Sequence, residues 1–247
     1  NNIRDVDLAL DRNGALLVLM ASYGGGLQLA DLSGHTAATL TGSGQGLYLR
    51  HAEVPPDFGS TGVAMVVGSG DLLLSQDAGS SWEKVNSESG ETHLLASSSD
   101  PDLDDRLFSN TSLGGNTRFF YSTDQGSTWS EGTVDFPCDG NGSAYALSPN
   151  YGIDGIIWGS CTGDGSVYQS RDRGESWVRK AVPGEATYAM SAIESGEAVL
   201  VGGSRGLLRV DAEGTLTEVG FVGEQIHGLA AASDWGSDPT IVLVTAR

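Results

Sequence analysis

The sequence has little positive charge. Its 247 residues hold 13 Lys and Arg against 32 Asp and Glu, which gives a formal net charge of −19. Nucleic-acid binding depends on basic side chains that neutralise phosphates, and no basic cluster stands out here. DNA, RNA and anionic membrane surfaces are therefore poor candidate partners, and we interpret the acidic excess as a hydrated surface.

Long apolar runs and metal motifs are also missing. No window approaches about 18 uninterrupted apolar residues, the length that a membrane helix needs, so no membrane insertion is expected. There is no HExxH, no Cys/His cluster and no phosphate-binding GxxxxGK[ST]. We therefore expect no cofactor. The acidic stretch "DPDLDD" at 100–105 offers the oxygen ligands that Ca²⁺ prefers, although an ordinary acidic turn is the simpler interpretation.

Helical periodicity is absent, and short apolar runs separated by Gly- and Asp-containing turns take its place. In residues 144–181 the runs "AYALSP", "GIIWGSC", "SVYQSRD" and "WVRKA" are separated by "NYGID", "TGDG" and "RGES". This pattern predicts four short antiparallel strands, which we call A to D from the innermost to the outermost.

One string within this unit recurs along the chain. "SQDAGSSW" begins at residue 75, "STDQGSTW" at 122 and "SRDRGESW" at 170. Four-stranded units that repeat every 40 to 50 residues or so are typical of β-propellers. We therefore predict an all-β fold, a β-propeller of four-stranded antiparallel blades with five complete blades and half of a sixth. The blades of this single domain, 1–247, cover about residues 5–41, 47–86, 93–133, 144–181 and 188–220, with the half blade at 226–247.

The repeated string has a structural role on the turn between strands C and D. Its Gly permits positive φ, its Asp accepts hydrogen bonds from the amides of the turn, and its Trp begins strand D and buries a ring between blades. The residues with these roles are Ser75, Asp77, Gly79, Trp82, Ser122, Asp124, Gly126, Trp129, Ser170, Asp172, Gly174 and Trp177.

The pattern S-x-D-x-G-x-x-W resembles the Asp box, or BNR repeat. This repeat occurs in sialidases, xyloglucan-active glycoside hydrolases, sortilin-type receptors and photosystem assembly propellers. The resemblance covers three units in register and implies the propeller fold. It implies no catalytic residue, because in these families the box is a structural turn away from the active site.

A binding site is expected on one face of the propeller. The connectivity places the B–C and D–A loops on one face, and the C–D hairpins and A–B turns on the other. Propellers usually carry their site on the first of these faces and at the mouth of the channel. The candidate binding residues are Tyr23, Arg118, Phe136, Asp139, Asp164, Arg205 and Glu224, and the further loop carboxylates are Asp135 and Glu185.

The two cysteines indicate a compartment. Cys138 lies in the D–A loop 133–143, and Cys161 ends strand B of the same blade, so both are predicted on the same face. A disulfide between them contributes about 3 kcal/mol in the chain-entropy treatment. It would favour an extracellular, cell-surface or periplasmic location, whereas two unlinked buried thiols would suit an intracellular protein. Asn110 and Asn141 begin N-x-S/T sequons, which matter only in a secreted protein.

These features favour a non-catalytic propeller that is exported or surface-exposed. It would recognise a protein or a glycan, or form part of a larger assembly. The first alternative is a carbohydrate-active Asp-box glycoside hydrolase, although the arginine cluster and the Phe/Tyr-Arg-Ile-Pro motif of sialidases are missing. The second is an assembly factor similar to the photosystem propellers, and the shortage of Arg and Lys argues against it.

The last unit contains only two predicted strands. Its second strand, "TIVLVT" at 240–245, is apolar, and an unpaired apolar edge recruits other strands. We expect Thr240–Thr245 to pair with strands of another chain or of a C-terminal segment. The alternative is a closed five-bladed ring with the last hairpin packed on it.

Overall fold

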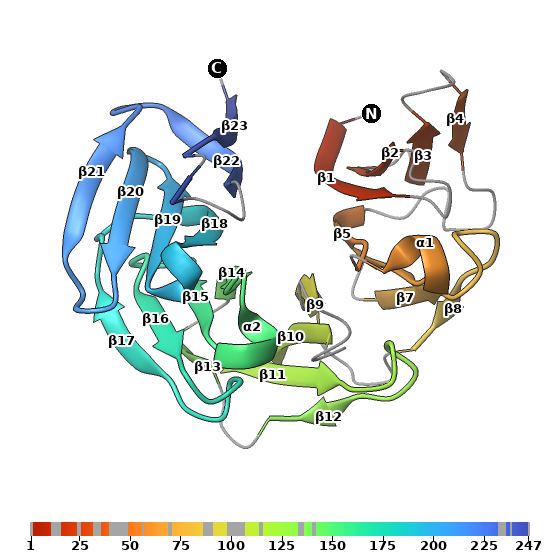
Figure 1. The fold of residues 1–247 in the computed structure, drawn as a ribbon, viewed down its shortest axis with the longest axis horizontal. Helices are drawn as coiled ribbons and strands as arrows, with labels where there is room; N and C mark the ends of the chain where they lie inside the picture. Colours follow the sequence, from red (N-terminus) through yellow and green to blue (C-terminus); the bar gives the residue numbers. More distant parts are fainter. Residues whose placement is uncertain are drawn as a thin grey trace. The chain divides into compact units, whose positions relative to one another are not determined.

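The computed structural model consists almost entirely of β-strands, with two four-residue α-helices in the part of the chain that it describes (Figure 1). The described residues are 2–10, 16–23, 26–31, 36–39, 49–55, 57–68, 71–85, 91–97, 107–113, 116–132, 136–139, 142–231, 236–237 and 239–246. Over these ranges, no helix has the length and apolar character that a membrane crossing requires.

The chain divides into two compact units. Unit 1 comprises residues 1–113 and 120–131, and unit 2 comprises residues 114–119 and 132–247. The boundary falls inside the third repeat and does not separate two predicted blades. The single domain over 1–247 stays a prediction.

Unit 1 contains two antiparallel sheets whose four strands follow one another in chain order. The first sheet consists of β1 (Asn2–Leu10), β2 (Leu16–Tyr23), β3 (Gly26–Asp31) and β4 (Thr36–Thr39). The second consists of β5 (Leu49–Glu53), β6 (Ala64–Gly68), β7 (Asp71–Ser75) and β8 (Glu83–Lys84), with helix α1 (Phe58–Thr61) between β5 and β6.

The third sheet includes residues of both units. Its strands β9 (Glu91–Ser97), β10 (Leu107–Leu113), β11 (Asn116–Ser122) and β12 (Ser130–Glu131) follow the same order. A fifth strand, β13 (Phe136–Asp139), pairs with the first residues of β11.

Unit 2 contains two further four-stranded sheets and a two-stranded one. The fourth sheet consists of β14 (Gly142–Leu147), β15 (Ile157–Cys161), β16 (Val167–Ser170) and β17 (Val178–Ala181), with helix α2 (Tyr151–Asp154) between β14 and β15. The fifth consists of β18 (Thr187–Ile193), β19 (Ala198–Gly203), β20 (Gly206–Asp211) and β21 (Leu216–Gly220). The two-stranded sheet pairs β22 (Gln225–Ala231) with β23 (Ile241–Ala246).

These sheets confirm the predicted all-β fold and its four-stranded antiparallel blades. The two-stranded sheet corresponds to the predicted half blade. Every residue of strands β6, β15 and β19 is buried, because each of these second strands is covered on both faces. In unit 2, a single apolar cluster joins Trp158 and Val167 of the fourth sheet to Val199 and Val210 of the fifth, so the core lies between blades.

Candidate binding face

The three Asp boxes have nearly identical hydrogen bonds. In the first box the Ser75 hydroxyl donates to Asp77 Oδ1 at 2.9 Å and accepts from the Gly79 amide at 2.8 Å. Asp77 also accepts from the amide and the hydroxyl of Ser81, at 2.8 and 2.6 Å. Gly79 has φ +84°, and the corresponding glycines at 126 and 174 have +85° and +90°. The side chains therefore close the turn, as the repeat predicts.

The Trp side chains of the boxes pack on neighbouring apolar clusters. Trp82 and Trp129 each donate their indole N–H to a carbonyl of their own turn, at 3.1 and 3.0 Å. In the third box, Trp177 Nε1 is buried without a hydrogen-bond partner in the described residues. Its ring instead stands edge-on to Phe136, with 4.7 Å between the centroids.

The structure assigns a role to the A–B turns. Helices α1 and α2 each end in a glycine with left-handed φ, Gly62 and Gly155. The carbonyls of these glycines accept from the amides of Ala78 and Arg173, at 2.9 and 3.1 Å. The first and the third Asp box are thereby hydrogen-bonded to the A–B turns of their own blades. Both motifs are structural.

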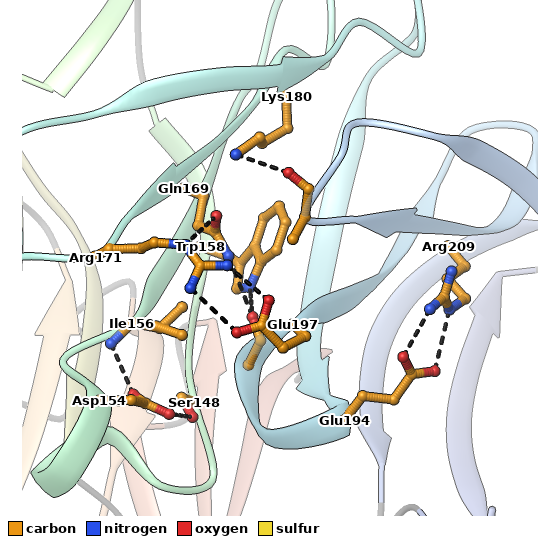
Figure 2. Close-up of polar contacts among 12 residues, drawn as sticks. Ser148, Asp154, Ile156, Trp158, Gln169, Arg171, Lys180, Glu194, Glu197 and Arg209 are labelled. Atoms are coloured by element: carbon orange, nitrogen blue, oxygen red, sulfur yellow. Dashed lines mark hydrogen bonds and ion pairs between the residues drawn. The ribbon is translucent and has the colours of Figure 1, made fainter.

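Charged side chains near the A–B turns and the third Asp box of unit 2 are paired with one another (Figure 2). The two terminal nitrogens of Arg171 donate to the Glu197 carboxylate at 3.1 and 2.7 Å, and Arg209 donates to Glu194 at 2.7 Å. The hydrogen bond from Arg171 lowers the pKa of Glu197, and the same contact raises the pKa of Arg171. The Arg171–Glu197 pair therefore links the fourth sheet to the fifth, whereas the Arg209–Glu194 pair lies within the fifth blade.

The turn that carries both glutamates has an unusual backbone. Glu194 and Ser195 have φ of +52° and +53°, a region that non-glycine residues rarely adopt. The next carbonyl, of Gly196, accepts from Trp158 Nε1 at 2.8 Å and from Gln169 Nε2 at 3.2 Å (Figure 2). Contacts to the fourth sheet thus stabilise this strained turn.

The predicted disulfide is present in unit 2. Cys138 of β13 and Cys161 of β15 are bonded, with 5.6 Å between their Cα atoms. Phe136 is 1% exposed and packs in the same cluster, beside the rings of Tyr145 and Trp177. The interpretation of Phe136 as a ligand-binding residue is therefore wrong. Its ring packs in the apolar cluster with Cys138 and Cys161.

A repeated irregularity distinguishes the first strand of each blade. At one position in every A–B pair the register shifts by one residue, so that one residue of strand A has no partner opposite it. Bulges of this kind re-aim a side chain and are frequent next to functional sites. The bulged residues are Arg4, Arg50, His93, Ser143, Tyr188 and His227.

Two of these bulged residues contact each other in unit 2. The rings of Tyr188 and His227 are stacked, with 4.7 Å between centroids and 14° between planes. Both side chains are exposed. The side chains of Arg4, Arg50 and the other two bulged residues lie outside the described part. This set was not predicted, because a bulge is defined by which residues of two strands lie opposite each other, and that pairing forms only in the folded sheet.

The loop before β22, the strand that carries His227, has exposed apolar side chains. Phe221 and Val222 are 47% and 73% exposed, and Phe221 has φ +58°. The carbonyl of Arg205, in the β19–β20 turn, accepts from the Gly223 amide at 2.9 Å. Two loops of the predicted functional face are thus held together.

The charged candidates on this face lie in neighbouring loops of unit 2. Asp164 accepts from the amide and the hydroxyl of Ser166 at 2.8 and 2.7 Å, and these bonds lower its pKa. Glu185 accepts from the Ser204 hydroxyl at 2.8 Å and lies 3.9 Å from Arg205, whose side chain is 72% exposed. The Glu224 side chain is exposed.

The remaining candidates are not brought to this group of loops. Arg118 lies in β11 and is half-buried. Tyr23 ends β2 and Asp139 ends β13, and the structure does not describe their side chains. Asp135, Asn141 and the proposed Ca²⁺ stretch 100–105 lie outside the described residues. Asn110 is 0% exposed in β10, so its sequon is inaccessible in the folded chain.

Comparisons with known proteins agree with this fold. A family profile described as Sortilin, neurotensin receptor 3 (Sortilin-Vps10) matches residues 70–182. A comparison with curated proteins found no match. A chain of the structure "Crystal structure of Nidogen/Laminin Complex" aligns with a TM-score of 0.64 and 11% identity, over 86% of this chain and 78% of that one. A chain of "YCF48 bound to D1 peptide" aligns with a TM-score of 0.63 and 12% identity, over 98% and 75%.

The chain is thus an Asp-box β-propeller, and no particular member of that superfamily is indicated. The profile match covers less than half of the chain, and the two structural likenesses establish the fold. The profile match and the disulfide are compatible with an extracellular or lumenal location.

Proposed function

We propose that this protein is a non-catalytic binding propeller, exported or surface-exposed, that recognises a protein partner through the loop face of unit 2. The observation that carries the proposal is the exposed stack of Tyr188 on His227, together with the exposed side chains of Phe221 and Val222 in the loop that leads into the strand of His227. Aromatic and apolar side chains that are held exposed by bulged or strained backbone are typical of recognition surfaces.

The carboxylates of this face support binding over hydrolysis. A glycosidase needs one carboxyl group with a raised pKa as its acid. The hydrogen bonds from Ser166 instead lower the pKa of Asp164. Glu185 accepts a hydrogen bond from the Ser204 hydroxyl at 2.8 Å and lies 3.9 Å from the Arg205 guanidinium, so it already has partners within this face.

The two similar structures also favour a protein partner over a glycan. One names a complex of nidogen with laminin, and the other names a bound peptide. At this level of identity they establish the fold alone, so the partner class is our proposal for this chain.

Cross-linking capture from extracellular protein, followed by affinity measurement with the identified partner, tests the proposal. We expect the double variant Phe221→Ser, Val222→Ser to weaken the complex at least about tenfold, because apolar side chains at the centre of an interface dominate its energy. Ile153→Ser is the matched control, since Ile153 is 76% exposed in α2, at the other end of the blade.

Two outcomes would contradict the proposal. The first is an equal loss of affinity in the loop variant and in the Ile153→Ser control. The second is hydrolysis of a sialoside or a β-glucan that Asp164→Asn abolishes, which would establish the glycoside hydrolase instead.

A further inference from the structure

The loop face of unit 2 combines apolar, aromatic and acidic groups. We infer that it binds a basic polypeptide segment in which Lys or Arg flanks an apolar side chain. This inference rests on the proposed function and specifies the chemistry of the partner. It is carried by four groups: the Phe221–Val222 tip, the Tyr188–His227 stack, and the carboxylates of Glu224 and Asp164. Their loops are joined in series, because Gly184 donates to the Asp164 carbonyl, Ser204 to that of Ala186 and Gly223 to that of Arg205.

The apolar part of the site is the tip of the β21–β22 loop. Phe221 and Val222 are adjacent in the chain and exposed to 47% and 73%. The positive φ of Phe221 is stabilised locally, because its carbonyl accepts from the Glu224 amide at 3.0 Å. The Gly223 amide also donates to the Arg205 carbonyl, which ties the tip to the β19–β20 turn. A tip that is held in this way loses little freedom when an apolar group packs on it.

The backbone of the Phe221–Val222 tip packs closely on the β19–β20 turn. A Cβ atom at Gly206, which begins β20, would lie 2.7 Å from the Phe221 carbonyl oxygen. The backbone of the loop is thus packed directly on the turn, and the side chains of Phe221 and Val222 stay on the solvent side. Their exposure follows from the backbone contact, and it leaves apolar surface that a partner can cover.

The aromatic part of the site lies a few residues further along β22. The imidazole of His227 is stacked on the Tyr188 ring, and its Nε2 lies 3.3 Å from Gln225 Oε1. The ring positions are therefore defined by contacts between β18 and β22. The faces of aromatic rings attract guanidinium and ammonium groups.

The charge of these loops favours a cationic partner. In the described loops 162–166, 182–186, 204–205 and 221–224, the charged residues are Asp164, Glu185, Glu224 and Arg205. Arg205 lies nearest to Glu185, while Glu224 has no ion pair within the described part of the chain. The whole chain carries −19, so an acidic segment is repelled at long range as well.

Three synthetic peptides of equal length test the inference with the full chain. Each has the same Leu-Phe centre, flanked by Lys and Arg, by Asp and Glu, or by Ser and Gln. Fluorescence anisotropy is measured at low and at physiological salt. We expect the basic peptide to bind at least about tenfold tighter than the acidic one and to weaken several-fold as salt rises, since screening shortens the range of the charges.

Variants assign the binding to this site. Phe221→Ser with Val222→Ser is expected to reduce affinity for the basic peptide at least about tenfold, and Glu224→Gln about threefold with a smaller salt dependence. Ile153→Ser should leave the affinity unchanged. All four substitutions replace exposed side chains, and thermal unfolding of each variant checks that it is folded.

The inference is overturned if the acidic peptide binds as tightly as the basic one, if no peptide binds, or if Ile153→Ser weakens binding as much as the loop variant. Failure of the peptides does not decide the proposed function. A captured protein that still depends on Phe221 and Val222 would leave the binding propeller intact and reject only the basic segment. Loss of that dependence would reject both.

Discussion

The aspartates of the Asp boxes are the residues whose ionisation the structure controls most directly. Hydrogen bonds from Ser81 and from Thr128 hold the pKa of Asp77 and of Asp124 below 3.8. For Asp172, burial raises the pKa, but hydrogen bonds from Ser176 and Ser170 lower it by more, so the pKa is lowered overall. Each carboxylate is thus bound more strongly as an anion in the folded state than in the unfolded chain.

This ionisation predicts a pH dependence of stability. A group whose pKa is lowered by folding stabilises the protein above its unfolded pKa, and the stabilisation is lost as pH falls through 3.8 towards the folded value. We expect urea unfolding to give a lower free energy of unfolding for the triple variant Asp77→Asn, Asp124→Asn, Asp172→Asn than for wild type, and we call this difference the gap. The gap should be constant above about pH 5 and shrink below about pH 4. A gap of the same size at pH 3 and pH 6 would contradict this origin.

A second prediction at this scale concerns the glycine of the third box. Gly174 has φ +90°, and a Cβ atom there would lie 2.5 Å from Cε1 of the Phe119 ring. We expect Gly174→Ala to lower the free energy of unfolding by about 3 kcal/mol, since backbone strain and overpacking add. Gly163→Ala is the control, because a Cβ atom at Gly163 would have no atom of the described residues within 4 Å. Equal stability of both variants in denaturant unfolding would refute the argument.

At the scale of elements, the disulfide joins a strand that has little backbone pairing in the described part of the chain. Strand β13 pairs with β11 only at Asn116 and Thr117, with a break in register between them. Cys138 links it to β15, a fully buried strand of the fourth sheet. The disulfide therefore connects β13 covalently to a buried strand of the fourth sheet.

We expect reduction of this disulfide to destabilise unit 2 by about 3 kcal/mol. The measurement is thermal or urea unfolding with and without reductant. The double variant Cys138→Ser, Cys161→Ser should have the stability of the reduced protein and show no response to reductant. A wild-type protein that is equally stable in both conditions would show that the bond contributes nothing.

At the scale of the whole molecule, the last sheet differs from the others. Strand β23 is hydrogen-bonded to β22, and the described residues supply no third strand to this sheet. Ile241 and Leu243 pack on the cluster around Ile226, whereas Val242 is 64% exposed. The pairing of Thr240–Thr245 with strands of another chain or of a C-terminal segment stays a prediction.

Hydrogen exchange tests this pairing. We expect the outward-facing amides of Ile241–Ala246 to exchange rapidly in the dilute chain of 247 residues, because no described strand accepts them. They should become protected when a strand is supplied, either by a second copy at high concentration or by a longer form of the chain. The amides of β19 serve as the internal control. Slow exchange throughout β23 in the dilute monomer would favour the closed alternative.

The sequence by itself determined the Asp boxes, the blades and the disulfide. The Asp boxes could be predicted because their hydrogen bonds join residues two to four positions apart, as from Ser75 to Asp77 and Gly79. The blades followed from the repetition of those boxes. The pairing of Cys138 with Cys161 could be predicted because the D–A loop that holds Cys138 and the end of strand B that holds Cys161 belong to the same face of one blade.

The candidate site could be predicted only in part. Asp164, Arg205 and Glu224 were found because loops on one face follow from the connectivity of the strands. The burial of Phe136 was missed, because an aromatic residue in a loop has the same local pattern whether it packs inward or outward. The stack of Tyr188 on His227 depends on a bulge in each strand and on the packing of β18 beside β22. Only the tertiary structure decided these features, because contacts between residues far apart in the chain determine them.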